Sequence, residues 1–183
     1  AYGRAQRVFR AKEKVNEPGH KSHITQRAAG KEPLFLENDD YLAMLGLLKE
    51  SAERFNLGYY ALCLMPNHLH ILIEPQLRNL SRAMHFVFSN YAARFNRKYQ
   101  RKGHLFGGPY RQAVCLDSSY LLSASVYIHL NPVKAELCAS PESYRWSSCS
   151  LYCRGTEEES FVDPSPVLEL LDDDPASART EYS

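Results

Sequence analysis

The sequence predicts an α+β fold of the ferredoxin-like, split βαβ type, in which an antiparallel sheet carries helices packed on one face. Three observations predict this fold. Some short segments alternate apolar and polar residues or are rich in β-branched ones, and longer segments repeat apolar residues at helical spacing. These segments follow one another in the order β-α-β-β-α-β-α. The length of 183 residues suits one domain, with or without a tail.

The first half of the chain contains one strand, one helix and a pair of strands. Residues 23–27 alternate and include β-branched side chains, which predicts a short strand. Polar residues at 38–40 offer side chains that cap helix N-termini, and apolar residues recur at helical spacing over 41–55. Residues 59–64 and 68–74 then predict two strands, paired as a hairpin across a short break.

The second half of the chain contains a helix, a strand and a further helix. An apolar stripe beginning at Leu80 predicts a long helix that ends near residue 100. After a glycine-containing loop, residues 111–116 predict the fourth strand. Residues 117–119 offer capping side chains for the last helix. We expect this helix to end around Asn131, because the proline that follows disfavours helical geometry in the residue before it.

The net charge of +1 conceals three separate blocks of charge. Residues 1–36 carry eight Lys and Arg against three acids, residues 76–116 carry eight and no acid, and residues 154–183 carry nine acids and two basic residues. Such separation favours a basic face for a polyanion and an acidic tail, the alternative being ordinary solvated surface charge. We therefore expect a basic arm at 1–17, a folded domain at 18–153, and an acidic, partly flexible segment at 154–183.

Several classes of protein are excluded by composition. No apolar run approaches the ~18–20 residues that span a bilayer, and the basic amino end lacks the apolar stretch of a secretory signal. We therefore expect a cytoplasmic protein without a membrane partner. The cysteines are odd in number and lack the paired spacing of a zinc site, so we expect reduced thiols at Cys63, Cys115, Cys138, Cys149 and Cys153.

A pair of histidines on the third predicted strand suggests a metal site. Side chains alternate along a strand, so His68 and His70 project from one face while Leu69 and Ile71 project from the other. Two imidazoles ~7 Å apart along a strand can converge on one divalent ion. The alternative is that two histidines lie side by side on a half-exposed strand without a chemical role.

A tyrosine on the last predicted helix suggests a nucleophile. Tyr120, Ala124, Tyr127 and Asn131 lie on one helical face, with small neighbours that leave room at the hydroxyl of Tyr127. One turn later, Asn131 supplies a carbonyl oxygen of the kind that Mg²⁺ or Mn²⁺ prefers. The alternative is that this tyrosine is a core aromatic residue.

These residues resemble the motifs of a known family. His68-Leu69-His70 resembles the His-hydrophobe-His (HUH) motif, and Tyr127 with Asn131-Pro132 resembles the Tyr-x-x-x-Asn-Pro motif of REP-associated tyrosine transposases. These belong to the single-tyrosine transposases that act on single-stranded DNA. The resemblance extends over residues 18–152, with supporting matches at 19–27, 65–68 and 143–148. The long acidic carboxyl end departs from shorter relatives and leaves regulation and oligomeric state, monomer or homodimer, open.

The resemblance implies an HUH endonuclease fold and a set of functional residues within a catalytic domain at 18–153. Tyr127 matches the nucleophile that forms a 5′-phosphotyrosine, and His68, His70 and Asn131 match the ligands of a Mg²⁺ or Mn²⁺ ion. The implied activity is that of a DNA endonuclease and strand transferase acting on single-stranded or hairpin DNA. Because an acidic tail can compete with DNA, we expect removal of residues beyond about 163 to preserve or increase activity.

Binding of DNA is expected from the basic segments. Candidates for phosphate contacts are Arg27, Arg94, Arg97, Lys98, Arg101, Lys102 and Arg111. Candidates for stacking with unpaired bases are His104, Phe106 and Tyr110, although the last two have the alternative role of packing their loop. His23 has two interpretations as well, since it either lines the site or serves the first strand structurally.

Two further classes of function compete with the transposase. The same fold suits a regulator that binds single-stranded nucleic acid without cleaving it, although the glycine-aromatic pattern of RNA-recognition modules is absent. A metallohydrolase that activates water is also compatible with a histidine pair. A covalent protein–DNA adduct that depends on Tyr127 distinguishes the transposase from both.

Overall fold

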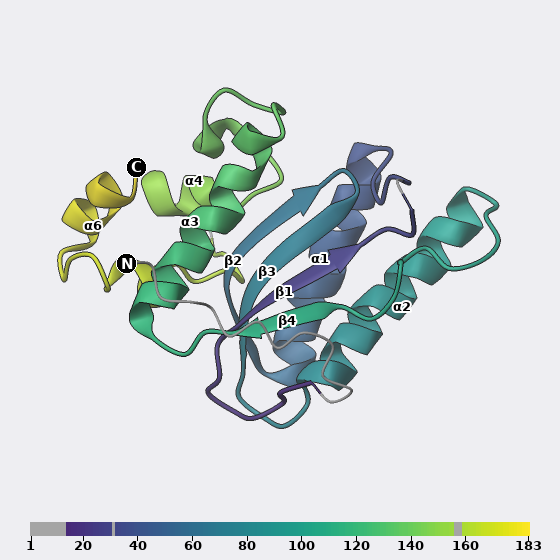
Figure 1. Cartoon of the computed structure of the whole chain (residues 1–183), viewed down its shortest axis with the longest axis horizontal. Coiled ribbons are helices and arrows are strands. Elements are labelled where there is room, and N and C mark those ends of the chain that lie inside the picture. The colour runs from purple at the N-terminus through teal and green to yellow at the C-terminus, as the bar shows by residue number, and fades with distance from the viewer. Residues whose placement is uncertain (1–13, 31, 156–158) are drawn as a thin grey trace.

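The computed structural model describes residues 14–30, 32–155 and 159–183 and forms an antiparallel sheet flanked by helices (Figure 1). The elements are β1 (Ser22–Arg27), α1 (Asn38–Phe55), β2 (Leu57–Met65), β3 (His68–Pro75), α2 (Leu80–Lys98), β4 (Arg111–Val114), α3 (Ser118–Lys134), η1 (Pro141–Ser143), α4 (Cys149–Cys153), α5 (Ser165–Leu168) and α6 (Pro175–Tyr182). The strand order is β2-β3-β1-β4, with every neighbouring pair antiparallel. This confirms the ferredoxin-like α+β fold predicted from the sequence.

One face of the sheet is covered by α1 and α2, as predicted (Figure 1). Alternation along β3 sends Leu69, Ile71 and Ile73 into this layer, where all three are buried. They pack in one cluster with apolar residues of the two helices, such as Met44 and Val87. The larger apolar core therefore lies on one side of the sheet and leaves the other side for different residues.

The opposite face is covered in part by α3, which packs on β2 and β3. Leu121, Ala124 and Ile128 of α3 are buried in a second cluster together with Cys63 of β2 and Leu72 of β3. This apolar contact fixes the position of α3 across the sheet. The polar residues of β1 and β3 that share this face lie beside the helix.

The last helix continues past the predicted end at Asn131, because α3 includes Pro132 and ends at Lys134. A proline inside a helix removes its own hydrogen bond to the carbonyl four residues earlier and crowds that carbonyl with its ring, but it leaves the later hydrogen bonds of the helix possible. Here the ring is buried, and the following turn is closed by Ala135 N, which donates to Asn131 O at 3.0 Å, and by Leu137 N, which donates to Pro132 O at 2.9 Å. The helix therefore tolerates the proline and extends by one turn.

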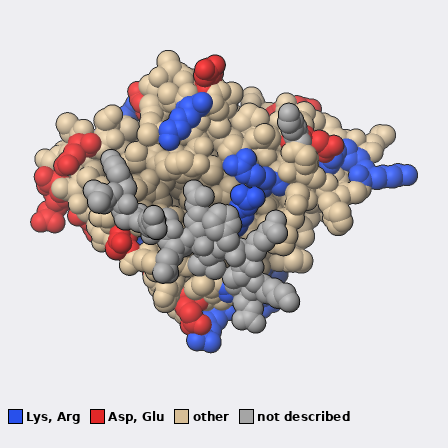
Figure 2. All heavy atoms as spheres, in the orientation of Figure 1, with Lys and Arg blue, Asp and Glu red and all other residues tan. Residues whose placement is uncertain are grey.

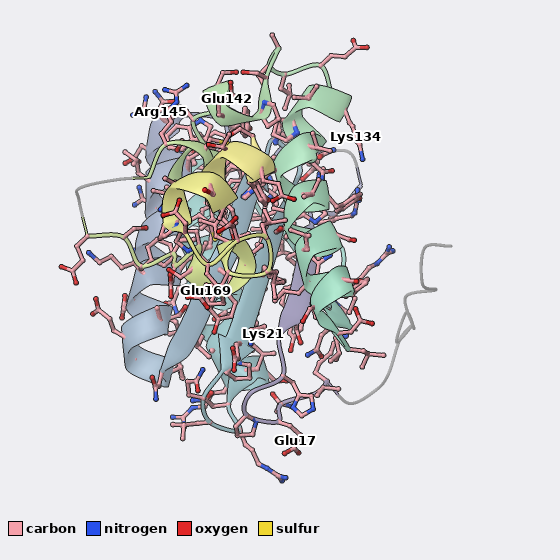
Figure 3. The ribbon with its side chains drawn as sticks, turned by 90° about the vertical axis from the view of Figure 1, so that its left-hand side faces the viewer. Glu17, Lys21, Lys134, Glu142, Arg145 and Glu169 are labelled. Atoms are coloured by element: carbon pink, nitrogen blue, oxygen red, sulfur yellow. The ribbon has the colours of Figure 1, made fainter. Side chains whose placement is uncertain are left out.

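The carboxyl segment packs against the back of α3. Val167, Leu168 and Ala178 are buried in the same cluster as the inner face of α3. In Figure 3 the segment carrying Glu169 lies across the sheet beside α3. Arg179 donates to the carbonyl oxygens of Leu151 and Tyr152, the latter at 3.2 Å. This packing leads us to expect, against the sequence-based expectation, that removing the segment destabilises the domain.

The amino-terminal arm is described only from residue 14, and residues 1–13 lie outside the described part of the chain. Val15 exchanges two hydrogen bonds of 2.9 Å with the side chain of Gln112 on β4. Asn16 accepts a 2.7 Å hydrogen bond from the backbone of Ser81 at the start of α2. The end of the arm is thus attached along β4. Within the described ranges, no helix combines the length and apolar character needed to cross a membrane.

Candidate active site

Three strands contribute polar side chains to the face of the sheet that α3 partly covers. His68 and His70 of β3 lie opposite Arg27 and Thr25 of β1 in the antiparallel register. Thr25 in turn pairs with Arg111 of β4. Directly opposed residues point to the same face, so the two histidines share one surface with a threonine and two arginines.

Tyr127 of α3 lies beside this histidine pair. The centroid of its ring is 5.6 Å from that of His70 and 5.9 Å from that of His23, with edge-to-face geometry in both cases. The tyrosine is 43% exposed, so its hydroxyl is not sealed in the core. The structure therefore brings together the strand and the helix that the sequence singled out, although they are far apart in the chain.

His70 is held by hydrogen bonds through one ring nitrogen only. Its Nδ1 lies 2.9 Å from His23 Nε2 and 3.2 Å from Thr25 Oγ1. Its Nε2 is buried and has no hydrogen-bond partner among the described residues. A buried polar atom without a partner costs free energy, unless a ligand occupies the space it faces. Donation from Nδ1–H leaves Nε2 with the lone pair that a metal ion requires.

His68 is oriented in the same manner. Its Nδ1 lies 2.7 Å from Oδ1 of Asn67, an oxygen that only accepts, so Nδ1 donates and Nε2 keeps its lone pair. The rings of His68 and His70 have centroids 5.0 Å apart. His68 therefore presents an unprotonated Nε2, and His70 does the same in the tautomer whose Nδ1 donates, so the pair of imidazoles fits a divalent ion.

The environment favours the neutral form of all three histidines. Burial lowers the pKa of His70 to about 2, with further lowering by His23, His68 and Arg27. Burial and then Arg27 lower the pKa of His68 to about 4, and burial lowers the pKa of His23 to about 4. Neutral imidazole is the form that ligates metals, so the site is prepared for a cation at neutral pH.

Asn131 lies one turn beyond Tyr127 on α3 and is the third predicted ligand. Its Nδ2 donates to the backbone carbonyl of Tyr127 at 2.7 Å, which leaves its Oδ1 as the acceptor available to a ligand. Across the described ranges, no group of three His, Cys, Asp or Glu residues could hold a metal. Those residue types therefore supply no third ligand beside the two histidines in the described ranges, and Asn131 stays the predicted one.

Two further residues contact the site: Lys134, which was not predicted, and His23, whose role the sequence left open between lining the site and a structural one. Lys134 places its Nζ 5.1 Å from the centroid of the Tyr127 ring, because α3 continues past Pro132. His23 touches both His70 and Tyr127. Alternation along β1 was the available signal for His23, whereas nothing in the sequence pointed to Lys134.

The predicted DNA contacts are divided between the two faces of the sheet. Arg27 and Arg111 are exposed on the face that carries the histidines. Arg94 pairs with Asp39 at 2.6 Å on the side of α1 and α2. Lys98 there pairs with three carboxylates, at 2.9 to 3.4 Å, and Arg101 pairs with Glu32. Charges already neutralised within the chain are poor candidates for phosphate binding.

The predicted stacking residues are also divided. Phe106 and Tyr110 pack their rings against Phe88, and Tyr110 is buried with its hydroxyl 3.2 Å from Ser81 Oγ. Tyr110 therefore fills the core beneath its loop and offers no face to a base, and Phe106 is partly buried against the same core. The third stacking candidate, His104, is exposed, and so are the phosphate candidates Arg97 and Lys102. Figure 2 shows Lys and Arg side chains near the centre of the viewed face and acidic ones at its left margin, over α6.

Comparison with known proteins identifies the family. The family model described as Transposase IS200 like matches residues 18–131. A solved structure of a REP-associated tyrosine transposase bound to a REP hairpin is similar in fold, with a TM-score of 0.67, 13% identity, and coverage of 82% of this chain and 92% of that one. The tRNA(His) guanylyltransferase of Saccharomyces cerevisiae gives a TM-score of 0.43 at 13% identity, covering 95% and 80%.

None of the curated proteins matches the chain in sequence. The family model nevertheless extends over most of the chain, from the residues before β1 to Asn131 on α3. It includes both histidines and the tyrosine that the fold brings together. The chain therefore belongs to the IS200-like transposase family of DNA-transposing enzymes.

Proposed function

We propose that the protein is a metal-dependent endonuclease and strand transferase for single-stranded DNA, with Tyr127 as its nucleophile. The observation that carries this proposal is the exposed tyrosine beside His70, whose buried Nε2 has no partner among the described residues. A transposase must both cut and rejoin strands. A tyrosine next to a cation site supplies what that chemistry requires.

In the proposed reaction, Tyr127 Oη attacks a DNA phosphate and displaces the 3′ oxygen of the neighbouring nucleotide. The bond between phosphorus and that oxygen breaks as a 5′-phosphotyrosine forms. The tyrosine loses its proton and the released 3′ oxygen gains one, so the products are the adduct and a 3′-hydroxyl. Attack by another 3′-hydroxyl reverses these steps and restores Tyr127, without loss of phosphodiester energy.

The nucleophile requires electrostatic assistance. A free tyrosine has a pKa near 10, so about one in a thousand is ionised at neutral pH. Lys134, whose Nζ lies 5.1 Å from the centroid of the Tyr127 ring, would add positive charge beside the attacked phosphate. His68, His70 and Asn131 would hold Mg²⁺ or Mn²⁺, which when bound stabilises the negative charge that develops on the phosphate oxygens. Arg27 and Arg111 would hold the flanking phosphates.

We propose hairpin-forming DNA as the substrate, with a single-stranded segment at the site. Support comes from the solved REP-associated transposase of similar fold, which is bound to a REP hairpin. Oligonucleotides from a panel of hairpins, incubated with Mn²⁺ or Mg²⁺, are expected to yield a covalent adduct on denaturing gels. Label at the 3′ end should travel with the protein, and label at the 5′ end should appear in a shorter free strand. Binding without any adduct would instead support the non-catalytic regulator.

His23 is expected to hold His70 in the orientation that binds the metal. Replacing His23 by Phe keeps a partly buried ring but removes the nearer of the two partners of His70 Nδ1, at 2.9 Å, and leaves Thr25 Oγ1 at 3.2 Å. Loss of such an outer partner typically weakens metal affinity about 10- to 100-fold. We expect a shift of this size in the Mn²⁺ concentration needed for half-maximal adduct formation. H23Q, which retains an acceptor, should shift it less, and the exposed control H20F should not shift it.

Arg111 is expected to contribute one phosphate contact. Its replacement by Gln should weaken DNA binding at every sequence alike and reduce the slope of log K against log salt by about one unit. The matched control is R94Q, because Arg94 is paired with Asp39 on the opposite face. Fluorescence anisotropy at several salt concentrations measures both slopes. A slope that falls for R94Q but not for R111Q would place the DNA on the other side of the sheet.

A further inference from the structure

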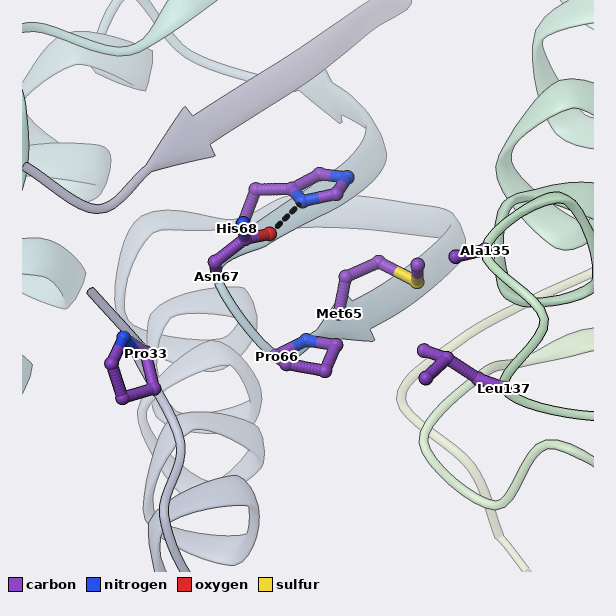
Figure 4. A pocket seen from close by; sticks show the side chains of 7 residues that line it. All are labelled: Pro33, Met65, Pro66, Asn67, His68, Ala135 and Leu137. Carbon is purple, nitrogen blue, oxygen red and sulfur yellow. Dashed lines mark hydrogen bonds between the residues drawn. The ribbon is translucent and has the colours of Figure 1, made fainter. Parts of the chain in front are cut away.

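A pocket of about 300 Å³ opens beside His68, between the turn that joins β2 to β3 and the chain that follows α3 (Figure 4). Its size is at the lower end of pockets that hold small ligands. In Figure 4 the side chains of Pro33 and Leu137 lie on opposite sides of Met65 and Pro66. The lining consists of Pro33, Met65, Pro66, Asn67, His68, Ala135 and Leu137.

The lining combines apolar walls with one polar end. Leu137 is 44% exposed, so a large apolar side chain faces solvent at the pocket. The polar end is formed by Asn67 and His68, which are joined by the 2.7 Å hydrogen bond between Oδ1 and Nδ1. That bond uses the oxygen of Asn67 and leaves its amide NH₂ to donate to a ligand. The pocket therefore suits a flat ligand group with apolar faces and a hydrogen-bonding edge.

The position of the pocket indicates which larger molecule carries this ligand group. His68 belongs both to the pocket and to the proposed metal site, and it lies opposite the exposed Arg27 in the strand register. One cationic side chain, that of Arg27, and the proposed metal site thus stand beside the polar end of an otherwise apolar hollow. A nucleotide has this combination, because its base has apolar faces and a polar edge and its phosphate is an anion.

We infer that the pocket receives one unpaired base of the cleaved strand, from a nucleotide next to the phosphate that Tyr127 attacks. This inference rests on the proposed function and adds to it a subsite that places the strand. A base held there fixes the adjoining phosphate beside the histidine pair, since the two are joined by a short sugar linkage. Part of the choice of cleavage position is then made by Asn67 and the apolar walls.

The test replaces the bases around the cleaved phosphate by abasic sites, one at a time, in a hairpin oligonucleotide with a single-stranded flank. One position next to that phosphate is expected to lower the rate of adduct formation about tenfold, the size of effect seen when one stacked base is lost. Rates that are equal for all abasic positions would overturn the inference while leaving the proposed function in place. Absence of adduct with every intact hairpin would overturn both.

Filling the pocket provides the matched variant. Ala135 lines the pocket and is exposed at the end of α3, so A135W should occupy the hollow without disturbing the core. This variant should cut the intact strand about as slowly as the wild type cuts the abasic one, and should no longer distinguish the two. A139W, at an exposed residue outside the pocket, should behave like the wild type. Equal behaviour of both tryptophan variants would contradict the inference.

A binding measurement separates the subsite from the chemistry. The fluorescent base 2-aminopurine, placed at the sensitive position, is expected to change its emission when the hairpin binds to the Y127F variant, which cannot form the adduct. The same change should be absent with Y127F combined with A135W. An identical signal in both proteins would show that the base lies elsewhere.

Discussion

Replacing Tyr127 by Phe is expected to abolish covalent adduct formation and strand release, by at least a thousandfold, because no other group replaces the nucleophile. The ring contacts with His70 and His23 survive this change, since only the hydroxyl is removed. With 43% of the side chain exposed, the hydroxyl contributes little to the core. We therefore expect the melting temperature and the affinity for hairpin DNA to stay near wild-type values, measured by circular dichroism and anisotropy.

The control for this variant is Y120F, which makes the same chemical change on the same helix, two turns earlier. It should form the adduct at close to the wild-type rate. Cleavage that continues in Y127F, with release of free product and no adduct, would identify an activated water as the nucleophile. The proposed role of Tyr127 would then be lost even if the metal site remained.

Removal of residues 164–183 is expected to destabilise the whole domain and to suppress activity. The deletion uncovers the back of α3 by taking away Val167, Leu168 and Ala178, which are at most 4% exposed. Burial of a Val or Leu side chain contributes about 1.5–3 kcal/mol, a large part of the total of about 5–15 kcal/mol that holds a typical domain together. A fall in the free energy of unfolding by several kcal/mol, measured in urea, is the expected result.

A single substitution tests the same contact without a deletion. The hydroxyl of Tyr182 lies 2.7 Å from His129 Nδ1 and 3.1 Å from Ser125 Oγ, both on α3. Y182F leaves these buried groups short of one partner, which should cost about 1–3 kcal/mol. The exposed neighbour Glu181, changed to Gln, serves as the control. A truncated protein that unfolds at the wild-type urea concentration and keeps full activity would show that the carboxyl segment is dispensable.

The sequence predicted the fold well because its periodicities are local and consistent. The four strands and the three long helices were each assigned within a few residues, since alternation and helical spacing record which face of an element is buried, whereas the short helices after α3 were not predicted. The histidine pair followed from the same rule. The juxtaposition of Tyr127 with His70 was not deducible from spacing alone, because it depends on α3 packing on β2 through a buried cluster that includes Ala124 and Cys63.

The predictions that missed concern interactions between distant residues. A run of basic residues on a helix has the same sequence pattern whether it binds phosphate or, like Lys98, pairs with acids 58 to 61 positions away. Aromatic residues in a loop give the same sequence pattern whether they are exposed or, like Tyr110, buried beneath the loop. The acidic composition of the carboxyl segment concealed the few apolar residues that attach it to α3. The composition of a segment reflects mainly its exposed residues, which are the majority. Its packing against the domain depends on the few residues that become buried.

The pairing register of β1 decides at once which of its side chains enter the core and which line the proposed active site. Ile24 enters the core from one side of this inner strand, while His23 and Thr25 meet His70 on the other. A slip of β1 by one residue against β3 would exchange the two sets, exposing the core residue and burying the polar ones among the helices. A chain with that error could not persist as a folded but inactive protein. Quality control that removes unfolded chains would therefore also remove this class of defective transposase, before it met any DNA.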